Sequence, residues 1–338
     1  MSLEQDGKVI KLTAAEISQL WSAYMNDSAS ICQLTYFLEK AEDQEIRTVI
    51  EQALRLAQSH IDKLTEIMNK ENFPIPYGFK LEEDVDVTAP RLFSDCYVLT
   101  YLSQMGKIGL SAYSLGVSLA DRSDVYSYFA ECLKESTDLH RQANEVLLPK
   151  GLYIRSPYLE IPENIDFVKK QSFLSGYFDK RTLTALEITN LFANFERNAL
   201  GNATLIGYSQ VAKSDEVRKY FKRGKEIAKK HCHIFGTILR NEDLPAPTTW
   251  DTEVSDSTAY TFSDKLMMFY TTALISLSIG YYGASVAGSP RRDIGTKYAD
   301  LTRDILLYAE DGVNIMIKNG WLEEPPRALD RDELAKKK

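Results

Sequence analysis

The sequence lacks the short motifs by which most enzymes are recognised. It has four histidines and four cysteines in 338 residues, and no two cysteines have Cys-x-x-Cys spacing. A nucleophile elbow, a P-loop and a dinucleotide-binding fingerprint are all missing. We therefore expect buried, reduced thiols and no catalytic residues, and the balance of the sequence is against an enzyme.

Positive charge and long apolar runs are also scarce. Lys and Arg number 40 against 48 Asp and Glu, a net charge of −8, which argues against nucleic acid as a partner. The N-terminus shows no apolar segment of a secretory signal. Residues 266–288 carry no charge, but they contain too many Ser, Thr and Gly residues for a membrane span. These absences predict a cytoplasmic protein without a membrane-spanning helix.

An internal duplication is the clearest positive feature. Residues 12–21, LTAAEISQLW, return as residues 183–192, LTALEITNLF, at an offset of 183 − 12 = 171. The alignment continues without a gap to Pro76 and Pro247, with 16 identities in 65 positions. The chain is therefore expected to consist of two copies of one structural unit.

Apolar residues at helical spacing predict four helices in each copy. In the first copy they cover about residues 13–40, 44–70, 91–120 and 123–149. We predict an all-α fold of two tandem ferritin-like four-helix bundles, because the long connection before each third helix favours a crossover over a simple up-down order. The expected parts are a first bundle (1–157), a linker with a short helix from Glu163 (158–180), a second bundle (181–326) and a tail (327–338).

Two matched glutamates have a structural explanation. Thr13 with Glu16, and Thr184 with Glu187, form the S/T-x-x-E capping box at the start of a helix. The matched turns at residues 121–124 and 291–293 contain arginines and aspartates, and we expect them to be solvated turns that cap the fourth helices.

The uncharged third helices need cover from water. A helix without a charged face is typical of one buried on all sides. Small residues match between the copies, for example Ser114 with Gly283. We predict that the third helices meet between the two halves or at the interface of a homo-oligomer.

The histidines are the only candidate metal ligands. The Glu-x-x-His pattern of di-iron bundles is missing, since Ala57 and Ala228 stand where the glutamates would be. His60 and His231 are matched and face their cores, with Asp27 and Asn198 expected nearby. Each is either a hydrogen-bonded core histidine or a ligand of a transition metal. In the crossover order His140 would lie about 12 Å from His60 along the bundle axis, whereas in the simple up-down order the two would be level and could share a metal. We expect His233 to face solvent.

Together these motifs resemble a known group. The LTAxEI segments, the histidines of the second helices followed by Pro-x-Pro, and the Phe-Ser-Asp that opens the third helices are similar to a family from spore-forming Firmicutes. That family is a ferritin-like four-helix domain of unknown function, often present twice and related to the spore coat protein F group. The resemblance implies a helical fold and an association with spores, and it supplies no catalytic residues.

Three functions remain open at this point. The first is a non-enzymatic structural or interaction protein of the spore coat with protein partners and no cofactor. The second is a metal-binding redox protein with a degenerate site near His60 and His231. The third is a carrier of a small apolar molecule, whose first sign would be a large apolar pocket.

Overall fold

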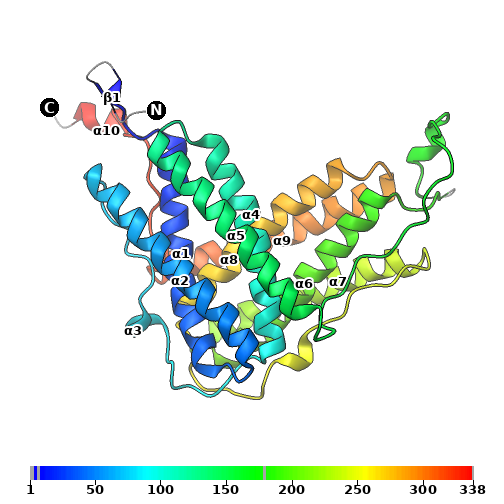
Figure 1. Cartoon of the computed structure of the whole chain (residues 1–338), viewed down its shortest axis with the longest axis horizontal. Coiled ribbons are helices and arrows are strands. Elements are labelled where there is room, and N and C mark those ends of the chain that lie inside the picture. Colours follow the sequence, from blue (N-terminus) through cyan, green and yellow to red (C-terminus); the bar gives the residue numbers. More distant parts are fainter. Residues whose placement is uncertain (1–3, 6–7, 178–179, 337–338) are drawn as a thin grey trace.

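Eight long helices form two four-helix bundles in the computed structural model, which describes residues 4–5, 8–177 and 180–336 (Figure 1). The first bundle contains α1 (Ala14–Lys40), α2 (Gln44–Lys70), α4 (Asp95–Leu119) and α5 (Ser123–Leu147). The second contains α6 (Ala185–Val211), α7 (Asp215–Arg240), α8 (Asp264–Ala287) and α9 (Arg292–Lys318). The predicted all-α class and its duplication are confirmed.

The remaining elements are short. They are β1 (Glu4–Gln5), β2 (Lys8–Val9), α3 (Leu81–Asp84), η1 (Gln171–Leu174), η2 (Asp251–Glu253) and α10 (Arg331–Lys336). No helix starts at Glu163, and the linker instead has the single 3-10 turn η1. Residues 158–170 are exposed throughout, so no packing offsets the cost of starting a helix there.

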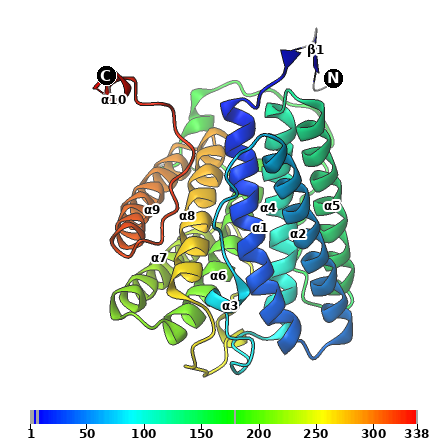
Figure 2. The same ribbon diagram turned by 90° about the vertical axis from the view of Figure 1, so that its left-hand side faces the viewer.

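The helix directions show the crossover order. The start of α4 lies beside the joint between α1 and α2, where the Asp95 carboxylate accepts the Asp43 N–H at 2.7 Å. Its end lies at the opposite end of the bundle, where Glu16 accepts the Arg122 N–H at 2.8 Å. Helices α2 and α4 therefore run parallel. Residues 71–94, which connect these two helices, pass along the whole length of the bundle (Figure 2). The second bundle repeats both contacts.

The ends of the bundles are closed by buried arginines. The Arg122 side chain is 1% exposed, and its guanidinium lies 2.6 Å from Glu71 and 2.7 Å from Asp124. Arg291 forms the same pairs with Glu242 and Asp293 in the second bundle. The expectation of solvated turns is thus wrong for these arginines, because each one ties the end of the second helix to the start of the fourth. The capping boxes of Glu16 and Glu187 are present as expected.

The two halves are joined by a set of reciprocal hydrogen bonds that we call the clasp, made by Asp84, Ser94, Glu253 and Ser263. Ser94 caps α4 and donates its hydroxyl to Glu253 at 2.5 Å. Ser263 caps α8 and donates to Asp84 at 2.6 Å. Asp84 corresponds to Glu253 and Ser94 to Ser263 in the two copies, since 253 − 84 = 169 and 263 − 94 = 169. The two hydrogen bonds are therefore equivalent, and the clasp has an approximate two-fold symmetry. Each crossover segment therefore secures the third helix of the other half.

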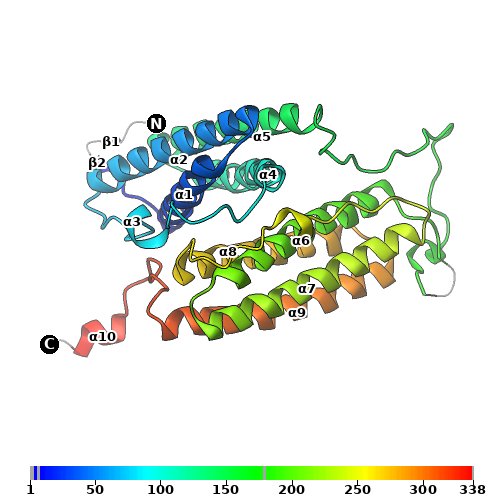
Figure 3. The ribbon, with the colours of Figure 1, turned by 90° about the horizontal axis from the view of Figure 1, so that it is seen from below.

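The third helices contact the other half through residues near their starts. Tyr97 on α4 bonds Thr204 on α6 at 2.7 Å, and Tyr270 on α8 contacts Ser30 on α1, so each third helix packs on the first helix of the other half. The two bundles then diverge (Figure 1), although they lie as two stacked layers in Figure 3. Leu115, near the end of α4, is consequently 50% exposed. The predicted burial of the third helices therefore holds for their first parts and not for their ends.

Removal of either clasp hydroxyl should destabilise the protein. We expect Ser94→Ala and Ser263→Ala each to lower the free energy of unfolding by about 1–2 kcal/mol, because each loses a helix cap and a hydrogen bond to a carboxylate of the other half. Urea unfolding followed by circular dichroism measures the change. Ser276→Ala is the control, since Ser276 is exposed and bonds only its own helix. Equal stability of all three variants would contradict a stabilising clasp.

Acid should weaken the closed ends of the bundles. Burial alone would raise the pKa of Glu16, but hydrogen bonds from Thr13 and Arg122 outweigh it and lower the pKa below the ordinary 4.5. The pKa of Glu187 is lowered in the same way, with Arg181 as the main partner. A carboxylate whose pKa is lower in the folded chain than in the unfolded chain stabilises the fold. This stabilisation is complete above the unfolded-state pKa and is lost as the pH falls through the folded-state pKa.

We therefore expect the urea midpoint to fall steadily below about pH 5, where the unfolded chain begins to bind more protons than the folded one. Glu16→Gln and Glu187→Gln should each flatten this slope while lowering stability at neutral pH. A slope that is unchanged in both variants would mean that other carboxylates control the acid response.

Candidate functional site

His60 lies at the centre of a polar cluster to which all four helices of the first bundle contribute. Its Nε2 atom is 2.8 Å from the Glu135 carboxylate on α5, and its Nδ1 atom is 3.4 Å from Oδ2 of Asp27 on α1. The hydroxyl of Tyr113 on α4 lies 3.4 Å from the same Nδ1 atom. The imidazole is thus held between two carboxylates, and the expected proximity of Asp27 is found.

Cys132 completes a set of metal-type donors. One donor atom each from His60, Cys132 and Glu135 lies within 4.8 Å of the other two. Cys132 and Glu135 are three residues apart on α5, which puts them on one face of the helix. Within the part of the chain that the structure describes, no other group of His, Cys, Asp and Glu side chains meets this criterion.

The electrostatics of the cluster favour a protonated imidazole. Burial by itself lowers the pKa of His60, but hydrogen bonding with Asp27, Cys132 and Glu135 outweighs it and raises the pKa to about 12. Burial raises the pKa of Asp27 and of Cys132. The Asp27 carboxylate is almost fully buried, and its Oδ2 atom, 3.4 Å from Nδ1 of His60, forms no well-aligned hydrogen bond.

His231 occupies the matching place in the second bundle, but its surroundings differ. Its Nδ1 atom is 2.9 Å from the Tyr282 hydroxyl, and Asn198 bonds that hydroxyl rather than the imidazole. Asp304 is 3.9 Å from Nε2 and is paired with Lys230 at 2.5 Å. Burial lowers the pKa of His231 to about 4, so this histidine is neutral.

The substitutions between the copies explain the difference. Asp27, Cys132 and Glu135 correspond to Asn198, Leu301 and Asp304 at the two offsets of the duplication, 171 for the first pair and 169 for the others. The second copy has therefore lost the thiol and one carboxylate, and its remaining carboxylate is shorter. The sequence predicts both His60 and His231 as candidate metal ligands. Among the described residues, only His60 lies close to other side chains that could bind the same metal.

The other histidines lie outside the cluster. His140 contacts Ser103 and Asn144 on the facing sides of α4 and α5. His233 is exposed, as the sequence predicts. Glu135 was not predicted from the sequence as a site residue, and Cys132 was predicted only as a buried thiol. The spacing of these two residues on the fourth helix was the available signal, but the helix pairing was needed to place them beside His60.

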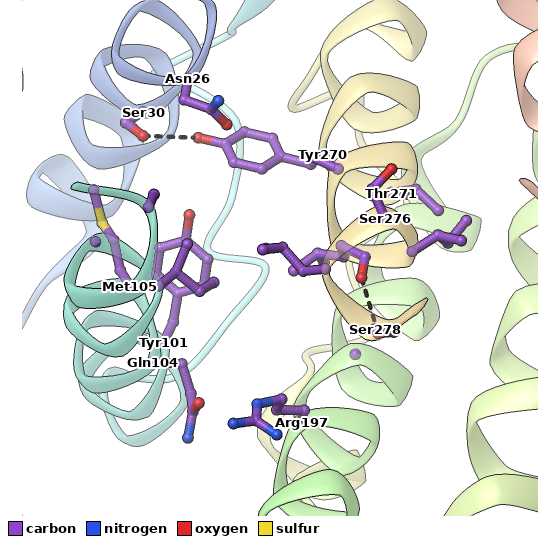
Figure 4. Close-up of a pocket in the computed structure, with 18 of the residues that line it drawn as sticks. Asn26, Ser30, Tyr101, Gln104, Met105, Arg197, Tyr270, Thr271, Ser276 and Ser278 are labelled. Carbon is purple, nitrogen blue, oxygen red and sulfur yellow. Dashed lines mark hydrogen bonds between the residues drawn. The ribbon is translucent and has the colours of Figure 1, made fainter. Parts of the chain in front are cut away.

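A large cavity opens between the two bundles and reaches this cluster. Its volume is about 460 Å³, and its walls come from α1 and α4 on one side and from α6 and α8 on the other. Apolar side chains such as Met105, Ile108 and Leu274 dominate the lining, and His60 and Asp27 form part of the wall. Figure 4 shows Tyr101 and Tyr270, equivalent residues of the two third helices, with the Tyr270 side chain reaching across to Ser30 on α1. The cavity exists because the bundles diverge beyond the clasp.

One cation faces the cavity without an acidic partner. The Arg197 guanidinium stacks 3.7 Å from the Tyr281 ring centroid and bonds the Asn194 side chain at 3.1 Å. Burial lowers its pKa, and it forms no ion pair within the described residues. The adjacent Glu196 is directed to Lys107 of the first bundle, at 3.8 Å. Arg197 lines the cavity (Figure 4), where it can meet an anionic group.

Comparison with known proteins identifies a family and some distant structures. A family model described as "Protein of unknown function (DUF3231)" matches residues 2–165 and again residues 171–334. No curated protein matches the sequence. A Bacillus halodurans protein provisionally assigned to the spore coat is 18% identical, covers 45% of this chain and 98% of its own, and has a TM-score of 0.39. A conserved hypothetical protein from Mycobacterium tuberculosis is 17% identical, covers 44% and 98%, and has a TM-score of 0.34.

These structural similarities are too weak to carry an argument about function. A separate property is that no helix in the described part of the chain is long and apolar enough to cross a membrane, which agrees with the expectation from the sequence.

The two histidines should differ in their contribution to stability. We expect His60→Leu to lower the free energy of unfolding by about 3–5 kcal/mol, because it leaves buried carboxylates without their cation. His231→Leu should cost about 1–2 kcal/mol, since a neutral imidazole loses one hydrogen bond. Urea unfolding of both variants checks the order. A His60→Leu protein as stable as His231→Leu would contradict a charged imidazole, and Asp27→Asn in the His60→Leu background should restore part of the loss.

Proposed function

Since this chain belongs to the DUF3231 family, whose function is unknown and whose domain it contains twice, we propose its role from the geometry of the site. The protein is a non-enzymatic binding protein that holds a small amphipathic molecule in the cavity between its bundles. The cavity itself is the observation that carries this proposal, because it is large, apolar and built by both halves.

The size and lining of the cavity suit such a molecule. Ligand pockets commonly have volumes of roughly 300–1,000 Å³ and mostly apolar walls with a few polar groups. The value of about 460 Å³ falls in this range. Apolar walls would take up a hydrocarbon chain or ring system, because burial of apolar surface supplies about 25 cal/mol for each Å² removed from water.

Arg197 indicates the polar end of the molecule. A partly buried guanidinium without a carboxylate partner is costly, and an anionic ligand would offset that cost with charge-assisted hydrogen bonds. The ring of Tyr281 already orients the guanidinium through its stacking contact. The class of ligand that fits best is therefore an apolar body with one carboxylate or similar anionic group, as in a fatty acid.

The wider setting of this binding is proposed on the sequence resemblance alone. We propose a cytoplasmic or spore-associated protein, with other proteins as further partners. Binding in the cavity does not depend on this setting, so the two parts of the proposal can be tested separately.

Binding can be tested with a pair of matched compounds. Dodecanoate and dodecanol share an apolar chain, and only dodecanoate is anionic. We expect both to displace an environment-sensitive naphthylamine probe from the folded protein, with dodecanoate the stronger. Arg197→Gln should weaken dodecanoate about tenfold, which corresponds to about 1.4 kcal/mol, and leave dodecanol unchanged.

Arg223→Gln is the matched control, because Arg223 also stacks on a tyrosine of the second bundle but does not line the cavity. Leu274→Trp should abolish binding of both compounds by filling the cavity. Absence of saturable binding, or binding that Leu274→Trp leaves intact, would overturn the proposal.

A further inference from the structure

We infer that His60, Cys132 and Glu135 form a binding site for one divalent transition metal of the zinc or cobalt type, oriented by Asp27. This inference goes beyond ligand binding in the cavity and does not rest on it. It concerns the first bundle alone and assigns a different donor set from the one that the two matched histidines suggest.

The chemistry of the donors selects the class of metal. One imidazole nitrogen, one thiolate sulfur and one carboxylate oxygen are the mixture that zinc sites use, with a fourth position open to water or another molecule. A thiolate together with an imidazole disfavours magnesium and calcium, which prefer oxygen ligands only. Co²⁺ binds to the same kind of tetrahedral site as Zn²⁺, so the absorption spectrum of Co²⁺ can be used to detect binding at this site.

The distances between the donor atoms require only small side-chain movements for a metal to bind. Tetrahedral ligands at about 2.0–2.3 Å from a metal are separated from one another by roughly 3.5 Å. The three donor atoms here lie within 4.8 Å of one another, and one pair, Nε2 of His60 and the Glu135 oxygen at 2.8 Å, would move apart slightly to admit the metal. Glu135 has a side chain that is 25% exposed, which leaves it free to rotate as the metal enters.

Asp27 is the independent observation that points to a metal. Histidines that bind metals usually donate their second ring nitrogen to a carboxylate, which fixes the tautomer and the orientation of the ring. Asp27 lies on the Nδ1 side of His60 while Glu135 lies on the Nε2 side. The buried Oδ2 atom of Asp27, 3.4 Å from Nδ1, thus has the position of the orienting carboxylate. A metal would replace the proton between Nε2 and Glu135.

The partly exposed Glu135 side chain supplies access to the open position. Cys132 is buried, but the Glu135 side chain beside Nε2 is 25% exposed, so water or another molecule can reach a metal bound there. The second bundle provides a control within the same molecule, because Asn198 and Leu301 replace the orienting carboxylate and the thiol. The full chain should therefore bind one metal rather than two.

The test uses the full chain without a histidine tag, stripped with a chelator and titrated with Co²⁺ under reducing conditions. We expect one Co²⁺ per chain, visible bands of tetrahedral cobalt and a near-ultraviolet band from thiolate coordination. Added Zn²⁺ should remove these bands. Cys132→Ser should eliminate the thiolate band, and Asp27→Asn should weaken binding about 10- to 100-fold.

Cys232→Ser and His231→Ala are the matched controls, since both residues belong to the second bundle and should leave the spectrum unchanged. Circular dichroism verifies that each variant is folded. Failure of the folded chain to bind Co²⁺, or a thiolate band that survives Cys132→Ser and disappears in another cysteine variant, would overturn the inference. Arg197→Gln should not affect the Co²⁺ titration. A failure of metal binding can therefore be distinguished from a failure of amphipathic ligand binding.

Discussion

The reciprocal exchange of hydrogen bonds in the clasp is the constraint on which the rest of the structure depends. Each third helix is capped by its own serine, and that serine is held by an acidic residue from the other half. The starts of α4 and α8 are therefore fixed against each other, while their far ends are free to separate. The cavity and the exposed helix ends both lie beyond this anchored region.

The duplication allowed much of the fold to be predicted. Helical spacing, the capping boxes of Glu16 and Glu187, and the length of the crossover segments each depend on residues close in sequence, and each is found in the structure. The burial of Arg122 was not predictable in this way, because a charged turn residue is normally solvated and its partner Glu71 lies at the end of another helix.

The candidate site was predictable only in part for the same reason. The position of Asp27 beside His60 follows from two antiparallel helices joined by a short loop, so simple arithmetic finds it. The contribution of Cys132 and Glu135 depends on the register of a fourth helix across a long crossover. The cavity depends on the angle between two bundles, and no residue pattern within one bundle contains that information.

The near two-fold symmetry of the clasp makes the chain equivalent to a dimer whose subunits have been fused. A linker of some twenty residues replaces association between separate molecules, so the pairing of the halves no longer depends on concentration. In a dimer of identical subunits, any substitution appears in both copies at once. Fusion removes that restriction, and one half can contain a charged histidine cluster while the matching histidine of the other half is neutral. Fusion therefore allows the surroundings of His60 and His231 to differ, which a dimer of identical subunits does not.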